Sequence, residues 1–219
     1  GTSILIPGFC SPVGELDVDI NEIVEEFVTA AVKNFWPAIY NDNLRVTVVE
    51  PDGTEHEADL DAVPEVRPFV ECFENRFDAD EELTDPGSVA KRTIDFEFTE
   101  SETGDEYEGE ADVFVRMPQP GEEEQGLTNS TAIFRGSGMV VDYVSMNEPA
   151  AYGHPYHAIL VAGNARGWGA GTLTDEDEAV DDFLKAAEPA SHTHWGSTPL
   201  LKKKYDRGCV GTAKSLQGD

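Results

Sequence analysis

The strongest structural signal in the sequence is an apolar stripe at helical spacing between Ile20 and Phe35. Its apolar residues recur at i, i+3, i+4 and i+7, so they share one face of an α-helix. Asp19, with Glu22 three residues later, forms an N-terminal capping pair, and we expect Pro37 to end the helix. The segment therefore predicts a helix over 19–35 with one buried face.

Most of the other periodic segments predict strands joined by hairpins. Residues 44–49 alternate in polarity, and the turn at 51–53 leads into a second strand at 54–58. A helix interrupted by two prolines is expected at 61–77. Further strands are expected at 91–100, 109–117, 130–135, 139–146 and 156–162, and a further helix at 175–187. This pattern favours an α+β fold, a mostly antiparallel sheet with two to three helices packed on one side.

Acidic residues outnumber basic ones by 44 to 15, which gives a formal net charge of −29. Such a charge can accompany disorder, calcium binding or adaptation to high salt. The aromatic residues and periodic segments oppose disorder, and no stretch has the Asp/Asn–Gly–Glu spacing of an EF-hand loop. At about 1 M salt the screening length is only about 3 Å, so dispersed carboxylates repel one another weakly. We therefore expect a surface adapted to high salt, without general affinity for nucleic acid.

The cysteines and the hydropathy pattern bear on location. Cys10, Cys72 and Cys209 lack the spacing of a metal site or a redox motif and fit a reducing cytosol. No apolar run approaches the roughly 18 residues of a membrane span. We expect a cytoplasmic protein without a membrane partner.

Segments that suggest a cofactor or catalytic site have simpler explanations. The glycine-rich stretch 163–171 precedes a helix whose first turn is acidic, so it is unsuited to phosphate and is expected to be a solvated loop. The paired histidines at 154/157 and 192/194 lack a third ligand at a diagnostic distance, so we expect no metal site. Ser137, between two glycines, indicates a hairpin turn, and we expect no catalytic residue in this chain.

Basic residues are the remaining candidates for a binding site. Arg135 could contact an anion or pair with a neighbouring acidic residue. Five of the fifteen basic residues, Lys202, Lys203, Lys204, Arg207 and Lys214, fall within thirteen positions. This basic segment could bind the acidic surface of its own chain, or it could contact a nucleotide phosphate, DNA or an acidic partner.

The first residues and several later segments resemble one family. Gly1-Thr2 followed by a short apolar strand resembles the last strand of the ATPase domain in the GHKL superfamily, which includes gyrase B, MutL, heat-shock chaperones and histidine kinases. The segments that follow are similar to the region after the ATPase domain in prokaryotic GHKL-type ATP-binding proteins, and with the acidic composition they suggest a haloarchaeal source. These segments are NEIVEEFVTAAVKNFWPAI, LRVTVVEPDG, IFRGSGMVVDYV, FLKAAEPASHTHW and LKKKYDRG.

The resemblance implies a domain organisation and a cofactor. Residues 1–12 would be the last strand of a nucleotide-binding domain, and residues 13–219 a transducer-like α+β domain with a candidate exposed linker at 118–129. The family's Glu-x-x-x-Asn helix and Asp-x-Gly-x-Gly motif are absent, so ATP and Mg²⁺ would bind the parent protein upstream of Gly1 and no cofactor would bind the chain itself. Thr2 would lie near the adenine, and the candidates for a phosphate contact are Arg135, Lys202, Lys203 and Lys204.

The function implied by the resemblance is a non-catalytic relay. The chain would transmit an ATP-dependent change from the N-terminal ATPase domain to a homodimer partner or to nucleic acid, in DNA processing or defence, with DNA contacting segment 202–214. The alternative is a self-contained acidic interaction module of a halophilic protein. A third hypothesis is a small hydrolase with an unrecognised set of acids or histidines.

Overall fold

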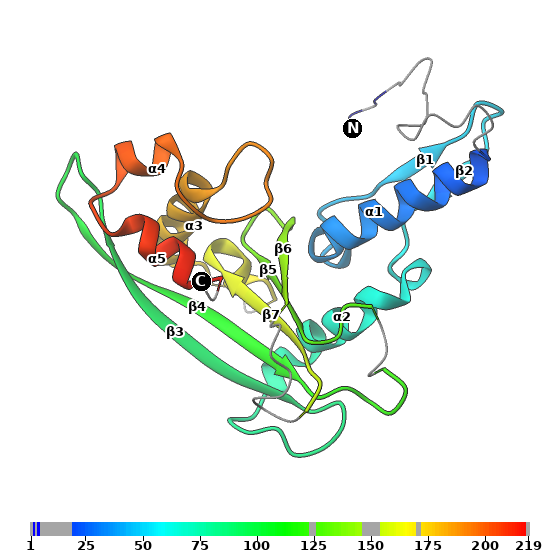
Figure 1. Ribbon diagram of the computed structural model, residues 1–219, viewed down its shortest axis with the longest axis horizontal. Helices are drawn as coiled ribbons and strands as arrows, with labels where there is room; N and C mark the ends of the chain where they lie inside the picture. Colours follow the sequence, from blue (N-terminus) through cyan, green and yellow to red (C-terminus); the bar gives the residue numbers. More distant parts are fainter. Residues whose placement is uncertain are drawn as a thin grey trace.

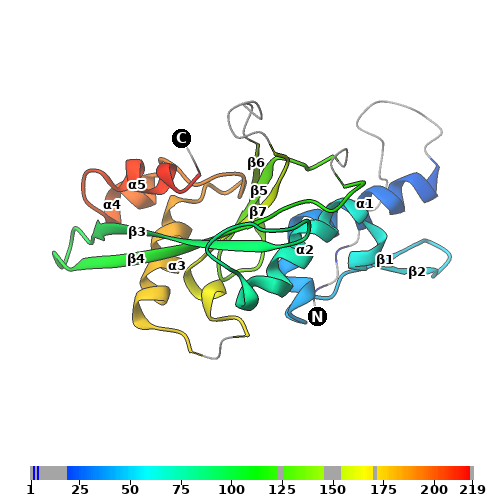
Figure 2. The ribbon, with the colours of Figure 1, turned by 90° about the horizontal axis from the view of Figure 1, so that it is seen from below.

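The computed structural model describes Thr2, Ile4 and residues 19–122, 126–145, 154–169 and 172–217. A five-stranded sheet forms its centre, with α1 and α2 toward one end of the molecule and α3, α4 and α5 toward the other (Figures 1 and 2). The sheet strands are β3 (Val89–Thr99), β4 (Glu106–Arg116), β5 (Ser130–Phe134), β6 (Val140–Ser145) and β7 (His157–Ala162). The helices are α1 (Ile20–Tyr40), α2 (Arg67–Glu74), α3 (Asp175–Ala187), α4 (Pro199–Lys204) and α5 (Cys209–Ser215), and β1 (Thr47–Val49) pairs with β2 (Glu55–Glu57) in a separate hairpin. The α+β class expected from the sequence is confirmed.

The last strand in the chain occupies the centre of the sheet. The strand order is β3-β4-β7-β5-β6, so that β7 lies between the hairpins β3–β4 and β5–β6. Neighbouring strands are antiparallel except β5 and β7, which run parallel. The sheet is therefore mixed, although most of its pairs are antiparallel as expected.

Residues of β7 alternate between two hydrophobic cores. Ile159 and Val161 pack with α1 and α2, whereas Leu160 and Ala162 pack with α3, α4 and α5. We expected two to three helices on one side of the sheet, but the described ranges hold five α-helices, and these cover both faces. The continuous apolar sequence of β7 is typical of a strand buried on both faces, and all six of its residues are buried.

Helix α1 continues through Pro37 to Tyr40, so its expected end at the proline is corrected. Proline has no N–H to donate to the carbonyl four residues earlier, which here belongs to Lys33. The hydroxyl of Tyr143 on β6 donates to this carbonyl instead, at 2.7 Å. Burial raises the pKa of the Tyr143 hydroxyl, which keeps it protonated as a donor. Contact with the sheet thus satisfies the carbonyl that Pro37 leaves without its helical partner.

Replacing Tyr143 with Phe is expected to lower the free energy of unfolding by about 1 to 3 kcal/mol, because the Lys33 carbonyl loses its donor. Urea denaturation followed by circular dichroism measures the change. Tyr107→Phe is the matched control, because no hydrogen bond involving the Tyr107 hydroxyl occurs in the described ranges, and its effect should stay within about 0.5 kcal/mol. An equal decrease in the free energy of unfolding in the two variants would contradict the role assigned to Tyr143.

The expected domain boundaries lie in regions that are only partly described. Of residues 1–12, the description covers Thr2 and Ile4 alone, so the expected first strand lies outside the described residues. Within the expected linker 118–129, Pro118 is buried and Glu122 binds Arg116, whereas Gln119 and Pro120 are exposed. None of the helices in the described ranges combines the length and apolar composition needed to cross a membrane.

Candidate functional site

The basic segment folds as two short helices, α4 and α5, that cover the second core. Thr198 caps α4, since its Oγ1 accepts a hydrogen bond from the Leu201 N–H at 3.0 Å. Leu201 is completely buried in the core, which leaves Lys202 and Lys203 exposed on the outer side. Helix α5 follows Gly208, whose φ of 113° is in the left-handed region that favours glycine.

Backbone hydrogen bonds fix this segment to the end of β3. The N–H of Ser101 donates to the carbonyl of Lys204 at 2.8 Å, and the N–H of Asp206 donates to the carbonyl of Thr99 at 3.0 Å. Tyr205 forms an isolated bridge with Glu100 and is buried in the second core. The lysines of α4 are therefore presented from a rigid support.

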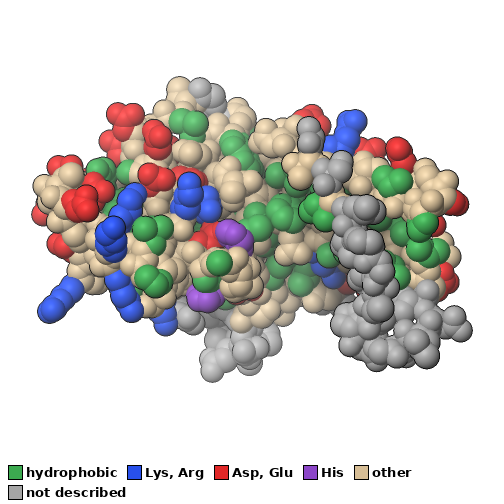
Figure 3. Space-filling view, turned by 90° about the horizontal axis from the view of Figure 1, so that it is seen from above, with side chains coloured by type: hydrophobic (Ala, Val, Ile, Leu, Met, Phe, Trp, Pro, Cys, Tyr) green, Lys and Arg blue, Asp and Glu red, His purple; other side chains and the backbone are tan. Residues whose placement is uncertain are grey.

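The basic side chains of this segment form no ion pair with any described carboxylate. Lys202, Lys203, Arg207 and Lys214 are exposed and Lys204 is half-exposed; we call these five side chains the basic surface. Seven basic residues elsewhere form ion pairs with described carboxylates: Lys33, Arg45, Arg67, Lys91, Arg116, Arg135 and Arg166. Figure 3 shows Lys and Arg side chains gathered toward the end of the molecule that carries α4 and α5. The described structure thus gives no sign that the basic segment binds the acidic groups of its own chain.

Arg135 has a different environment from the lysines. It lies at the end of β5, nearly buried, and donates to Asp181 at 3.2 Å and to Glu188 at 3.0 Å. Asp181 also accepts the N–H of Gly136 at 2.7 Å, which ties the β5–β6 turn to α3. A Cβ at Gly136 would lie 2.5 Å from the Cβ of Asn164, so only glycine fits there. Pairing with acidic residues, one of the two roles expected for Arg135, is therefore present, and a phosphate contact stays a prediction.

The predicted site residues are not joined to one another in the described ranges. Thr2 is exposed, and no hydrogen bond or ion pair connects it with Arg135 or with the three lysines of α4. The lysines share one helix, whereas Arg135 belongs to the ion pairs with α3. A contact between Thr2 and adenine stays a prediction.

The glycine-rich segment holds an arginine that sequence reasoning did not single out. Arg166, in the 3-10 turn Gly163–Gly167, donates to Glu110 at 2.5 Å, Asp112 at 3.2 Å and Asp177 at 3.0 Å. Burial alone would raise the pKa of Asp112, but hydrogen bonds from Thr93 and Lys91 and the charge of Arg166 lower it. The N-terminus of α3 is closed by a capping box of Thr174 and Asp177, in which each side chain accepts the backbone N–H of the other residue. This agrees with the expectation that this helix end is unsuited to phosphate.

A buried arginine, Arg116, was also missed. Arg116 at the end of β4 is 1% exposed and binds Glu71 of α2 and Glu122, the latter at 2.6 Å. Burial favours the neutral form of Glu122, yet hydrogen bonds from Arg116 and the Gln119 N–H outweigh it and lower the pKa of Glu122. A lone arginine at the end of an apolar strand signals a buried ion pair, but the sequence could not name its partners.

His157 lies beside this ion pair. It is completely buried, packs edge-on against Phe69 at 5.3 Å between ring centroids, and has no hydrogen-bond partner in the described ranges. Burial and the charge of Arg116 lower its pKa to about 4, so its ring is neutral at neutral pH. The described ranges hold no grouping of three or more His, Cys, Asp or Glu side chains that could bind a metal ion.

Comparison with protein-family models, with curated proteins and with solved structures finds no match. Among the described residues, the basic surface stands out because its side chains are exposed or half-exposed, are held on a segment hydrogen-bonded to the end of β3, and form no ion pair.

Proposed function

We propose that this chain is an interaction module of a salt-adapted protein and that its basic surface binds an acidic segment of a partner protein. The observation that carries the proposal is that none of the five side chains of the basic surface forms an ion pair with a described carboxylate, in a chain with 44 acidic residues. Exposed ion pairs contribute little to folding, so leaving these lysines unpaired costs the fold little and keeps them available for a partner.

An acidic protein segment fits this surface better than DNA does. A DNA duplex extends far beyond a six-residue helix such as α4, and its phosphates would meet the carboxylates that surround the basic surface. Asp206 lies exposed within the basic segment itself, and the chain carries a formal charge of −29. A compact acidic segment can contact the lysines without approaching the rest of this negative surface.

The double variant K202E/K203E tests the proposal. Titration of a glutamate-rich peptide, measured by calorimetry at the lowest KCl concentration that keeps the chain folded, should show binding to the parent chain. The variant should bind at least about tenfold more weakly, because two attractive contacts become repulsive. A short DNA duplex should not bind either chain.

Arg92→Glu is the matched control for this titration. Arg92 is exposed on β3 and, like the lysines, forms no ion pair in the described ranges, but it lies seven residues before Thr99, about 23 Å along the strand. The control should bind the peptide as the parent chain does. Equal weakening by Arg92→Glu, or tighter binding of the duplex than of the peptide, would overturn the proposal. The relay of an ATP-dependent change would use the same docking surface and stays a prediction.

A further inference from the structure

Strand β4 has a free edge over its first five residues. It pairs with β3 along its whole length, from Glu106 to Arg116, but its pairing with β7 begins only at Ala111. In the described ranges no backbone hydrogen bond joins residues 106–110 to any element other than β3. An unpaired strand edge is a template for the addition of an extended chain.

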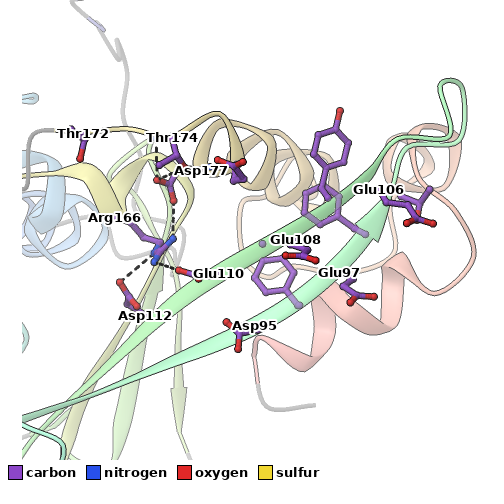
Figure 4. A pocket seen from close by; sticks show the side chains of 16 residues that line it. Asp95, Glu97, Glu106, Glu108, Glu110, Asp112, Arg166, Thr172, Thr174 and Asp177 are labelled. Carbon is purple, nitrogen blue, oxygen red and sulfur yellow. Dashed lines mark hydrogen bonds and ion pairs between the residues drawn. The ribbon is translucent and has the colours of Figure 1, made fainter.

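A groove of about 1240 Å³ runs along this edge. Figure 4 shows carboxylates of β3 and β4 on one wall, Thr172, Thr174 and Asp177 at the start of α3 on the other, and Arg166 at one end. A Cβ at Gly109 would lie 2.7 Å from the Cγ2 of Val180, so α3 packs closely on β4 at this point. The groove therefore has a fixed floor and is open along the strand.

The charge in the groove is strongly one-sided. Among the described residues, eight carboxylates and one cation, Arg166, line it, and Arg166 is already bound by three of the eight. The other five form no ion pair in the described ranges: Asp95, Glu97, Glu106, Glu108 and Glu176. These carboxylates are not grouped in a way that could hold a metal ion. A ligand complementary to these carboxylates would carry several positive charges at intervals along an extended chain.

We propose that the groove binds an extended, Lys- or Arg-rich segment of a partner protein, which pairs with the free edge of β4 as an additional strand. Side chains alternate along a strand, so Glu106, Glu108 and Glu110 face the same way. A bound strand would place cationic side chains beside them at every second position, where opposite charges stabilise neighbouring strands. Small residues between the cations would face Tyr107 and α3.

The partner segment comes from another protein rather than from a second copy of this chain. The clustered lysines of this chain are consecutive and helical, in α4, so they cannot present cations at alternate positions of a strand. This groove is separate from the basic surface, and the inference does not depend on the proposed function.

Two peptides of equal composition test the inference. One alternates lysine with threonine, and the other groups its lysines at one end. The alternating peptide should bind at least about tenfold more tightly, and hydrogen exchange should show new protection of those amides of residues 106–110 that point away from β3. Equal affinity of the two peptides, or protection confined to other residues, would overturn the inference.

The variant E106Q/E108Q removes two unpaired carboxylates of the groove without adding bulk. It should weaken binding of the alternating peptide at least about tenfold. The control E81Q/E82Q makes the same change of charge at exposed loop positions and should leave the affinity unchanged. Sedimentation of the chain without peptide identifies the occupant. Self-association that disappears in E106Q/E108Q would show that a second copy fills the groove, and the inference would be wrong.

Discussion

Replacing Arg116 with Met is expected to lower the free energy of unfolding by about 3 to 5 kcal/mol. The substitution leaves Glu71 and Glu122, which are both largely buried, without the guanidinium that neutralises them. Urea denaturation at a fixed KCl concentration measures the loss.

Two further variants separate this effect from a general loss of an arginine. Arg92→Met removes an exposed arginine that forms no ion pair with any described residue, and it should change the stability by no more than about 0.5 kcal/mol. The triple variant R116M/E71Q/E122Q should recover part of the loss, because no uncompensated carboxylate remains. A loss below about 1 kcal/mol in R116M alone would show that the buried ion pair contributes little to folding.

Transfer from molar KCl to dilute buffer is expected to unfold the protein, with loss of its far-ultraviolet circular dichroism. The screening length grows from about 3 Å at 1 M salt to about 30 Å at 0.01 M, so the net charge of −29 then acts across the whole molecule. The β3–β4 hairpin is one site of this repulsion. It places Glu97 directly opposite Glu108, neither of which forms an ion pair in the described ranges, and like charges at such positions are destabilising.

A charge reversal on this hairpin should lower the salt requirement. The E97K variant turns one repulsive cross-strand pair into an attractive one, so it should stay folded at a lower KCl concentration than the parent chain. E81K makes the same change of charge in a loop. It should lower the KCl concentration at the midpoint of unfolding by less than E97K does. Identical spectra of the parent chain with and without molar KCl would contradict adaptation to high salt.

Local patterns in the sequence were sufficient to predict most of the elements. The periodic stripe from Ile20 and the cap at Asp19 predicted α1, and the glycine turns predicted the hairpins, because these signals depend on neighbours in the chain. Strand bounds differed by a few residues; β4, for example, begins at Glu106 rather than at 109.

The remaining features depend on contacts between residues far apart in the sequence. Nothing near Pro37 indicates that Tyr143, on a distant strand, would allow the helix to continue. Arg116 and Arg166 have partners 45 and 54 residues away, in Glu71 and Asp112, which spacing alone could not identify. The groove beside β4 exists because β7 is shorter than β4 and begins its pairing at Ala111, and that register is a property of the assembled sheet.

The central position of β7 sets the order in which this protein can assemble during synthesis. The hairpins β3–β4 and β5–β6 meet only through β7, which is the last strand to leave the ribosome. Until residue 162 has emerged, α1 and α2 have no complete sheet on which to pack. Their apolar faces cannot be fully buried before β7 is made. The five-stranded sheet therefore cannot be completed before β7 has been synthesised, and closing such long-range contacts slows folding.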